Sequence, residues 1–288
     1  MELLAILIAM ILLQVWGSGA PLQFDGWFTE YRARVAAVLS GGPREFCVVL
    51  LPAAVVGVLS YLLHGVAYGM PELLLYIGVL LYSLGRGNIA EDIAEYLHRW
   101  QRGDFQAAFQ QLQSEPGFAG IQTPPTDAAS LHRCMRRHYY YRCYEGLFAV
   151  LFWFTVLGPA AALAYRLAAL ERSASLAQQQ DSSSGSLHLL HWLDWLPARL
   201  SGIGYALIGN FDACVDAWRQ RVTASRADAA ELIEACGDAA LGLRGLAAEA
   251  AGEALIQAGV REIEAIEALQ RRALVLWLVV IAVLMIRF

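Results

Sequence analysis

The chain has 288 residues, of which 58% are hydrophobic and only 16% are charged, a composition typical of a membrane protein and not of a soluble domain. Its 21 basic residues are all arginine, and the absence of lysine excludes a Walker-type phosphate loop and Schiff-base catalysis. The formal net charge of −5 argues against a nucleic-acid partner, because binding a phosphate backbone requires concentrated positive charge.

The first predicted region, residues 1–85, contains an N-terminal membrane helix and a helical hairpin. The apolar run over residues 3–16 is followed by GSGA, as in a cleaved signal peptide. It begins with Glu2, where a signal peptide is basic, so we expect a retained helix. Residues 46–66 are long enough to cross a bilayer, and a second run over residues 70–84 follows after a three-residue connection. These two runs are predicted to form the hairpin.

Residues 86–145 are predicted to form a helical loop on the cytoplasmic side. Asn88 is a helix-capping residue type, and apolar side chains then recur at helical spacing up to Trp100. The loop ends in a basic helix that begins at about Asp127. This helix carries Arg133, Arg136, Arg137 and Arg142. We expect these arginines at the level of the lipid headgroups, with a pocket for an anionic ligand as the alternative.

The same basic helix holds the only arrangement of residues that suggests a metal site. It contains His132, Cys134, His138 and Cys143, but their spacing fits no common zinc pattern. The five cysteines of the chain are an odd number without a CxxC pair, so a disulfide framework is not expected. We predict reduced thiols, no bound metal and no cofactor.

Residues 146–170 are predicted to form one kinked membrane helix. The run is apolar, and its central Gly158-Pro159 pair removes a backbone hydrogen-bond donor, which bends a helix. Residues 171–186 follow as a polar linker rich in serine and glutamine.

The stretch LDWLPARLSG places charge inside an apolar run over residues 187–211. An ionisable group at membrane depth costs about 2.5 kcal/mol or more, so such groups persist where they are paired or line a cavity. Asp194 and Arg199 do not face each other on a straight helix, but Pro197 interrupts the hydrogen-bond ladder between them. One alternative is a broken or re-entrant membrane helix that presents both charges to a ligand. The other is a helix in the membrane interface, with its tryptophans at headgroup depth.

The last part of the chain combines amphipathic and apolar segments. Residues 212–272 have leucine and isoleucine at helical spacing, which predicts two or three amphipathic helices, and residues 273–288 are predicted to form a C-terminal membrane helix. If residues 187–211 cross the membrane, 17 of the 21 arginines lie on one side, in residues 17–45, 86–145 and 212–272. The positive-inside rule places that side in the cytoplasm. The sequence therefore predicts an all-α, polytopic helical membrane protein with amphipathic cytoplasmic helices.

Two motifs resemble one protein family. LDWLPARLSGIGYALIGN at residues 193–210, followed by DAW at 216–218, resembles the signature of the AmpE family. GLFAVLFWFTVLGPAAALAYRL, which begins at residue 146, resembles the preceding span of the same family, and the likeness extends over the whole chain. The resemblance implies a multi-pass protein of the bacterial inner membrane that regulates β-lactamase induction and the response to cell-wall damage. It also implies a CobD/CbiB-like fold.

The AmpE family is similar in turn to adenosylcobinamide-phosphate synthase (CobD/CbiB), a membrane enzyme of cobalamin assembly. The synthase shares the proline-alanine-arginine-leucine signature found here at residues 197–200. Where the synthase has an acidic-asparagine pair this chain has Tyr141 and Arg142, and Glu145 replaces an aspartate. These changes remove groups that position an amide-forming substrate, so we predict no catalytic residues. The alternative function is a membrane enzyme related to the synthase, with ATP-dependent amide-bond formation or a derived activity. A transporter is disfavoured because the chain has no duplicated halves.

A ligand-binding site is predicted from the charged stretch and its surroundings. Its residues are Asp194, Arg199, Glu145 and Asn210. The expected ligand is a small anion, either a cell-wall fragment or a nucleotide, that binds near Arg199. The other predicted partners are the lipid bilayer and a second copy of the chain, and no nucleic acid is expected.

Overall fold

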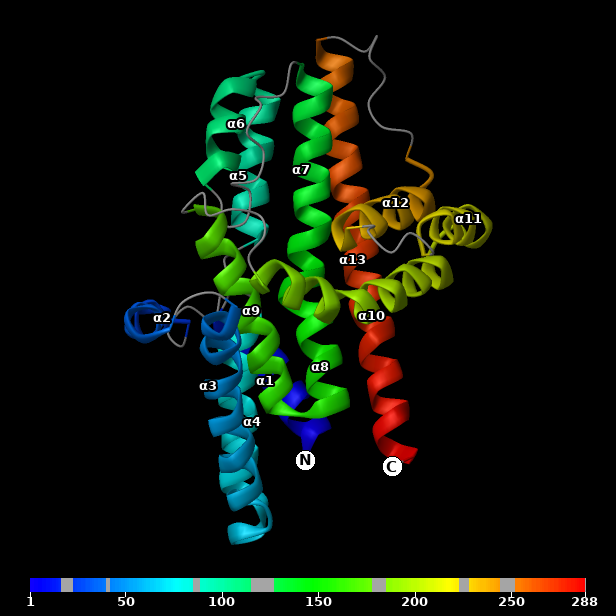
Figure 1. The fold of residues 1–288 in the computed structure, drawn as a ribbon. Helices are drawn as coiled ribbons and strands as arrows, with labels where there is room; N and C mark the ends of the chain where they lie inside the picture. Colours follow the sequence, from blue (N-terminus) through cyan, green and yellow to red (C-terminus); the bar gives the residue numbers. More distant parts are fainter. Residues whose placement is uncertain are drawn as a thin grey trace. The chain divides into compact units, whose positions relative to one another are not determined.

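The computed structural model describes residues 1–16, 23–39, 42–84, 89–114, 127–177, 185–222, 228–243 and 252–287. Every regular element within these ranges is a helix, so the predicted all-α class is confirmed (Figure 1). The helices form two compact units. Unit 1 comprises Met1–Asn88, Glu145–Leu193 and Ile281–Phe288, and unit 2 comprises Ile89–Tyr144 and Asp194–Val280.

Unit 1 contains the helices of the N-terminal region and of the central apolar run. They are α1 (Glu2–Trp16), α2 (Gly26–Val38), α3 (Gly42–Leu63), α4 (Met70–Ser83), α8 (Ala149–Leu157) and α9 (Pro159–Ala177). A 3₁₀ turn, Val66–Gly69, joins α3 to α4, and these two helices form the predicted hairpin. Helix α9 packs along α3 and α1 packs along α4, so the apolar hairpin is covered on its inner side by protein.

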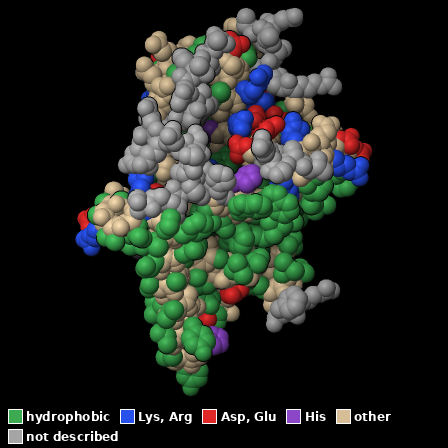
Figure 2. Space-filling model, viewed as in Figure 1, with side chains coloured by type: hydrophobic (Ala, Val, Ile, Leu, Met, Phe, Trp, Pro, Cys, Tyr) green, Lys and Arg blue, Asp and Glu red, His purple; other side chains and the backbone are tan. Residues whose placement is uncertain are grey.

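Three segments of the described residues are long and apolar enough to cross a membrane. They are Phe46–Leu63, Val66–Ser83 and Glu253–Met285, whereas the apolar helix Glu2–Val15 is shorter. Large apolar side chains on the outer face of α3 are exposed, among them Leu51, Val55 and Leu62. Figure 2 shows hydrophobic side chains covering the visible face of the α3–α4 hairpin. Such a surface is suited to lipid and not to water.

The central apolar run differs from the predicted kinked helix. Helix α8 ends at Leu157, Gly158 adopts φ +80°, and α9 begins at Pro159 and runs back beside α8 (Figure 1). The glycine-proline pair therefore reverses the chain. Helix α9 continues to Ala177, so residues 171–177 of the predicted linker are helical, and residues 178–184 lie outside the described residues.

Helix α10 (Gly185–Ile208) runs through Pro197 without the predicted break. A proline at 197 lacks the N–H that would bond to the carbonyl of Leu193 in an α-helix. Trp153 of α8 supplies the replacement, because its indole N–H donates to the Leu193 oxygen at 3.1 Å. An outside donor thus satisfies the carbonyl that the proline leaves open.

Unit 2 contains the helices that carry most of the charge. They are α5 (Ile89–Gln101), α6 (Phe105–Ser114), α7 (Ala128–Cys143), α11 (Phe211–Val222), α12 (Ala229–Leu241) and most of α13 (Glu253–Arg287). Asp127 caps α7, since its Oδ1 accepts a hydrogen bond from the Ser130 N–H at 3.0 Å. The predicted helix over residues 273–288 is the end of α13, a single helix of 35 residues.

Candidate functional site

Three helices of unit 2 meet at a buried arginine. Arg136 of α7 is 3% exposed, and its terminal nitrogens reach acids on two other helices. Nη2 lies 2.9 Å from Asp238 Oδ2 of α12, and Nη1 donates to Glu262 Oε2 of α13 at 3.0 Å. A buried guanidinium requires such partners, because the cost of removing it from water is otherwise not offset. Arg136 therefore pairs with protein carboxylates and is not open to lipid headgroups, which the sequence predicted as its partners.

His132 lies one turn before Arg136 and joins the same group, which we call the ion cluster (His132, Arg136, Asp238 and Glu262). Its Nε2 is 3.4 Å from Glu262 Oε2, and its Nδ1 is 3.2 Å from the hydroxyl of Tyr96 on α5. His132 is 1% exposed. The metal cluster that we considered around this histidine is not formed, because among the described residues no three histidine, cysteine or acidic side chains are placed to hold a metal ion.

Trp100 of α5 covers the ion cluster. It is fully buried, and its ring centroid lies 4.9 Å from that of His132. Its indole N–H donates to the Ile256 carbonyl of α13 at 3.1 Å. Gly259, one turn further along α13, makes this approach possible, since a Cβ at that position would lie 2.6 Å from Trp100 Nε1. Helices α5, α7, α12 and α13 are thus joined around one set of buried charges.

Asp238 is the member of the ion cluster whose titration is most displaced. Burial raises its pKa to about 7, and the negative charges of Glu234 and Glu262 act in the same direction. Arg136 and a hydrogen bond from Tyr140 lower the pKa but do not offset burial. The charge of the cluster therefore changes close to neutral pH.

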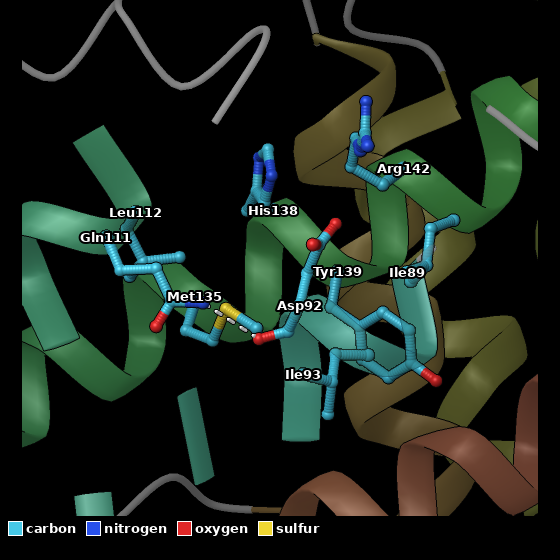
Figure 3. Close-up of a pocket in the computed structure, with 9 residues that line it drawn as sticks. All are labelled: Ile89, Asp92, Ile93, Gln111, Leu112, Met135, His138, Tyr139 and Arg142. Carbon is cyan, nitrogen blue, oxygen red and sulfur yellow. Dashed lines mark hydrogen bonds between the residues drawn. The ribbon is translucent and has the colours of Figure 1, made fainter. Parts of the chain in front are cut away.

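A recess opens between α5, α6 and α7 (Figure 3). It is lined by Ile89, Asp92, Ile93, Gln111, Leu112, Met135, His138, Tyr139 and Arg142, and it is shallow, with an enclosed volume of about 20 Å³. His138 and Arg142 are one turn apart on α7 and extend toward the same side in Figure 3. The Gln111 amide donates to the backbone oxygen of Asp92 at 3.1 Å, which ties α6 to α5 at the recess.

Asp194, the acid of the charged stretch, is held by tyrosines. It is 4% exposed, and its two carboxylate oxygens accept hydrogen bonds from Tyr141 at 2.8 Å and Tyr144 at 3.0 Å. The Tyr144 hydroxyl also lies 3.2 Å from the Asp194 backbone oxygen. These two tyrosines thus satisfy a buried carboxylate.

Arg199, the base of the same stretch, has backbone partners. Nη1 donates to the Trp195 oxygen at 2.9 Å and Nη2 to the Val222 oxygen at 3.0 Å. The guanidinium carbon lies 4.1 Å from the centroid of the Trp195 ring, a cation–π geometry. Arg199 thus ties α10 to the end of α11, and the ion pair with Asp194 suggested by the sequence is not among the contacts of the described residues.

The two remaining predicted site residues also have defined partners. Glu145 lies 2.9 Å from Arg172 of α9 within unit 1. Asn210 caps α11, since its Oδ1 accepts a hydrogen bond from the Ala213 N–H at 3.2 Å. Ligand binding at Asp194, Arg199, Glu145 and Asn210 stays a prediction.

Comparison with protein-family models shows which family the chain belongs to. The family model described as "Regulatory signalling modulator protein AmpE" matches residues 1–287. The chain belongs to the AmpE family. This membership identifies it as a regulatory signalling protein of the membrane.

The relatives of this AmpE-family chain are distant. Protein AmpE of Shigella flexneri is 27% identical over 227 residues, which cover 76% of this chain and 78% of that protein. Cobalamin biosynthesis protein CobD of Stutzerimonas stutzeri is 27% identical over 212 residues, 71% of this chain and 66% of that protein. CobD of Chromobacterium violaceum is 26% identical over 175 residues, 60% of this chain and 55% of that protein. No solved structure matches the chain.

Sequence patterns did not indicate the acidic half of the AmpE ion cluster. Asp238 lies 102 residues and Glu262 lies 126 residues beyond Arg136, so no local spacing connects them. The sequence could have indicated Asp238 only because this acidic residue directly follows Cys236 and Gly237, two buried positions of α12. Asp92 gives the same signal beside Ile93 on α5.

Proposed function

We propose that the chain senses a small anionic ligand at the cytoplasmic face of the bacterial inner membrane and modulates β-lactamase induction when the cell wall is damaged. The family description supports the regulatory part of this proposal. The apolar helices and the uneven distribution of arginine support the location. The observation that carries the sensing step is that α7 bears both the recess and the ion cluster.

The chemistry of the recess suits the charged end of an anion. Arg142 supplies a permanent positive charge, and His138 lies one turn away on the same helix. The Tyr139 hydroxyl and the Gln111 amide add hydrogen-bonding groups. Asp92 also lines the recess, and burial raises its pKa, which favours its neutral form beside an anion. The other lining residues are apolar. The enclosed part of the recess is only about 20 Å³, room for about one water, so the charged group of an anion would bind at its open mouth beside Arg142.

Helix α7 connects this recess to the membrane. Arg142 and His138 lie near its carboxyl end, and His132 and Arg136 lie in the preceding two turns. A ligand that draws Arg142 toward itself would displace α7 and change the two short contacts of Arg136. Glu262 would transmit that change, because α13 continues from it as an unbroken helix into an apolar segment. Such a shift requires that the ligand bind one arrangement of α7 more tightly than the other.

Calorimetric titration of the purified full chain in lipid nanodiscs tests the sensing step. The probes are soluble peptidoglycan fragments and nucleotide-linked wall precursors, each added separately. We expect saturable heat from one of these classes and its loss in Arg142→Leu, with no loss in Arg34→Leu, whose side chain is 82% exposed. The absence of heat with every probe, or unchanged affinity in Arg142→Leu, contradicts the proposal. Arg199→Leu in the same series tests the site predicted from the sequence.

The regulatory step is tested in cells that carry an inducible β-lactamase and lack their own copy of this protein. Cells with the wild-type chain and with Arg142→Leu are compared for β-lactamase activity after exposure to an inducer. We expect a changed induction ratio in the variant at equal amounts of protein in the membrane fraction. Equal ratios would separate the chain from β-lactamase regulation.

The similarity to two CobD proteins favours a second candidate function, a membrane enzyme related to adenosylcobinamide-phosphate synthase. Glu145 is the acid available for such chemistry, but its carboxylate is 9% exposed and lies 2.9 Å from Arg172. Expression in a strain that lacks the synthase tests this candidate. Growth that depends on cobalamin made from added cobyric acid would support it, and no growth would exclude synthase activity.

A further inference from the structure

Helices α8 and α9 are paired too closely to form one crossing. They lie side by side with opposite directions, and the chain turns at Gly158, whose φ of +80° is a left-handed conformation that favours glycine (Figure 1). Pro159 then begins α9, a position where its missing N–H costs no helical hydrogen bond. The helix before the turn is continuous with α7 through a π-helical turn, Tyr144–Phe148, but its apolar part is only residues 146–157. These twelve residues rise about 18 Å, whereas a bilayer core is about 30 Å thick.

Ion pairs hold both ends of the α8–α9 hairpin at one end of unit 1. Arg172 of α9 lies 2.9 Å from Glu145, which precedes α8. The neighbouring Glu171 lies 2.7 Å from Arg32 of α2 and 3.7 Å from Arg44. Arg44 lies in the first turn of α3, so the hairpin begins and ends where α3 starts.

The turn of the hairpin lies at mid-depth along α3. A Cβ on Gly57 would lie 3.5 Å from the Ala160 Cβ, which places the first turn of α9 beside Gly57. Gly57 is eleven residues beyond Phe46, the first residue of the apolar segment of α3. Eleven residues of helix rise about 16 Å, roughly half of the bilayer core.

A polar cavity surrounds this turn. Its volume is about 350 Å³, and its lining includes Glu2, Ser60, Tyr76, Thr155 and the turn itself. Backbone that leaves the helical pattern inside a membrane is tolerated only where it is buried in protein or lines a water-filled space. At about 30 Å³ for each water, the cavity has room for on the order of ten molecules.

From these contacts we infer that α8 and α9 form a re-entrant hairpin, which enters the bilayer from the arginine-rich side, turns at Gly158 beside a water-filled cavity, and returns to the same side. Buried side chains support this arrangement, since Val150, Leu151 and Phe154 of α8 and Ala162 of α9 are fully covered within unit 1. The body of the hairpin is thus covered by protein, whereas Val156 and Leu157 beside the turn are exposed.

The distribution of arginine agrees with the re-entrant hairpin better than with a crossing. If only α3, α4 and α13 cross, residues 17–45 and 84–272 lie on one side of the membrane. All of the 21 arginines except Arg287 and Arg166, which belongs to the hairpin itself, then lie on that side. If α8 and α9 formed one crossing, Arg172 would lie on the opposite side. The positive-inside rule therefore favours the re-entrant path.

Cysteine labelling with a membrane-impermeant maleimide tests the path of the chain. Single cysteines are placed in the full chain after the five native cysteines are replaced by alanine or serine. Arg34→Cys marks the arginine-rich side, and Tyr68→Cys, at a position 97% exposed in the α3–α4 connection, marks the other. We expect Ser173→Cys at the end of α9 to react from the same side as Arg34→Cys. Reaction from the side of Tyr68→Cys would show a crossing and overturn the inference.

The cavity is tested separately in the same background. A small, charged thiosulfonate reagent should modify Thr155→Cys, because water fills the space that this side chain lines. No modification from either side would contradict a water-filled cavity. As a check that does not depend on replacing the cysteines, a protease site is inserted within residues 178–184 of the otherwise unchanged chain. Cleavage only in inverted vesicles is expected, and cleavage only in right-side-out vesicles overturns the re-entrant path.

Discussion

At the scale of single residues, Arg136 links three helices of unit 2. It is 3% exposed and lies within 3.0 Å of two acids on different helices. Buried ion pairs contribute little net stability compared with an apolar replacement of all partners, but the loss of one partner leaves an uncompensated charge. The loss of stability on replacing one residue of the ion cluster therefore depends on which buried charges are left without a partner.

Arg136→Leu leaves Asp238 and Glu262 without their shared cation. We expect a loss of about 3–5 kcal/mol in the free energy of unfolding. Thermal unfolding in detergent, followed by tryptophan fluorescence, measures it. Arg34→Leu is the matched control, since this arginine is 82% exposed and pairs only with Glu30 along its own helix. Equal melting temperatures for the two variants would show that the ion cluster does not stabilise unit 2.

Asp238 gives a pH dependence with a defined sign. Its pKa is about 7 in the folded protein, against 3.8 for an ordinary aspartate. Between these values the folded state holds a proton that the unfolded state has released, so this group destabilises the protein as the pH rises from about 4 to 7. Asp238→Asn removes the titration. We expect its melting temperature to rise relative to wild type between pH 5 and pH 8, and a constant difference would contradict the raised pKa.

Composition and local spacing could not predict this arrangement of charges. The sequence indicated that α7 is helical and basic, but it did not indicate which arginine turns inward. That choice depends on Asp238 and Glu262, which belong to helices more than a hundred residues away. Similarly, Asp194 and Arg199 were predicted as a pair because they are close in sequence. In the structure Tyr141 and Tyr144 bind Asp194, and the Val222 carbonyl of α11 accepts a hydrogen bond from Arg199.

At the scale of helices, Trp153 compensates for the hydrogen bond that Pro197 removes from α10. The proline removes the donor for the Leu193 carbonyl, and the tryptophan supplies it. Trp153→Phe should leave that carbonyl unsatisfied, at a cost of about 1–3 kcal/mol. In a Pro197→Ala background the restored N–H takes over, so the same change should cost less. A double-mutant cycle of melting temperatures measures the difference, and equal costs in both backgrounds would show that the bond does not serve this purpose.

Close packing of α5 against α13 depends on a missing side chain. A Cβ at Gly259 would lie 2.6 Å from Trp100 Nε1, so Gly259→Ala should displace the tryptophan and lower stability by about 1–3 kcal/mol. Gly78→Ala is the control, since a Cβ there has no neighbour within 4 Å. Because alanine favours helix, that control should be neutral or slightly stabilising. Thermal unfolding compares the two, and a stable Gly259→Ala would indicate that α13 is free to move away from α5.

The sequence predicted the presence of the helices better than the points at which they end. Apolar runs of sufficient length predicted α3 and α4, and the helical spacing of Ile93 and Trp100 predicted α5. The Gly158-Pro159 pair was interpreted as a kink because the surrounding run is apolar throughout. The reversal depends on the φ of Gly158 and on the packing of α9 against α3, neither of which a hydropathy pattern contains.

At the scale of the whole molecule, α13 is the element that links charge to lipid. It carries Glu262 of the ion cluster in its first half, and Glu253–Met285 is one of the three described segments long and apolar enough to cross a membrane. The sequence predicted its first part among the amphipathic helices of residues 212–272 and its end as a separate membrane helix over residues 273–288. The structure has no boundary between these two parts, so the rotation of one half of α13 fixes the rotation of the other.

This continuity predicts a dependence on helical phase. Two alanines inserted after Val275 rotate the membrane half by about 200°, whereas four alanines rotate it by about 400° and so nearly restore its orientation. If α13 transmits the state of the ion cluster, the two-residue insertion should abolish the β-lactamase response and the four-residue insertion should retain most of it. Induction assays at matched amounts of membrane-inserted protein compare them. Loss of response in both would mean that length matters more than rotation, and retention in both would show that the signal does not pass along α13.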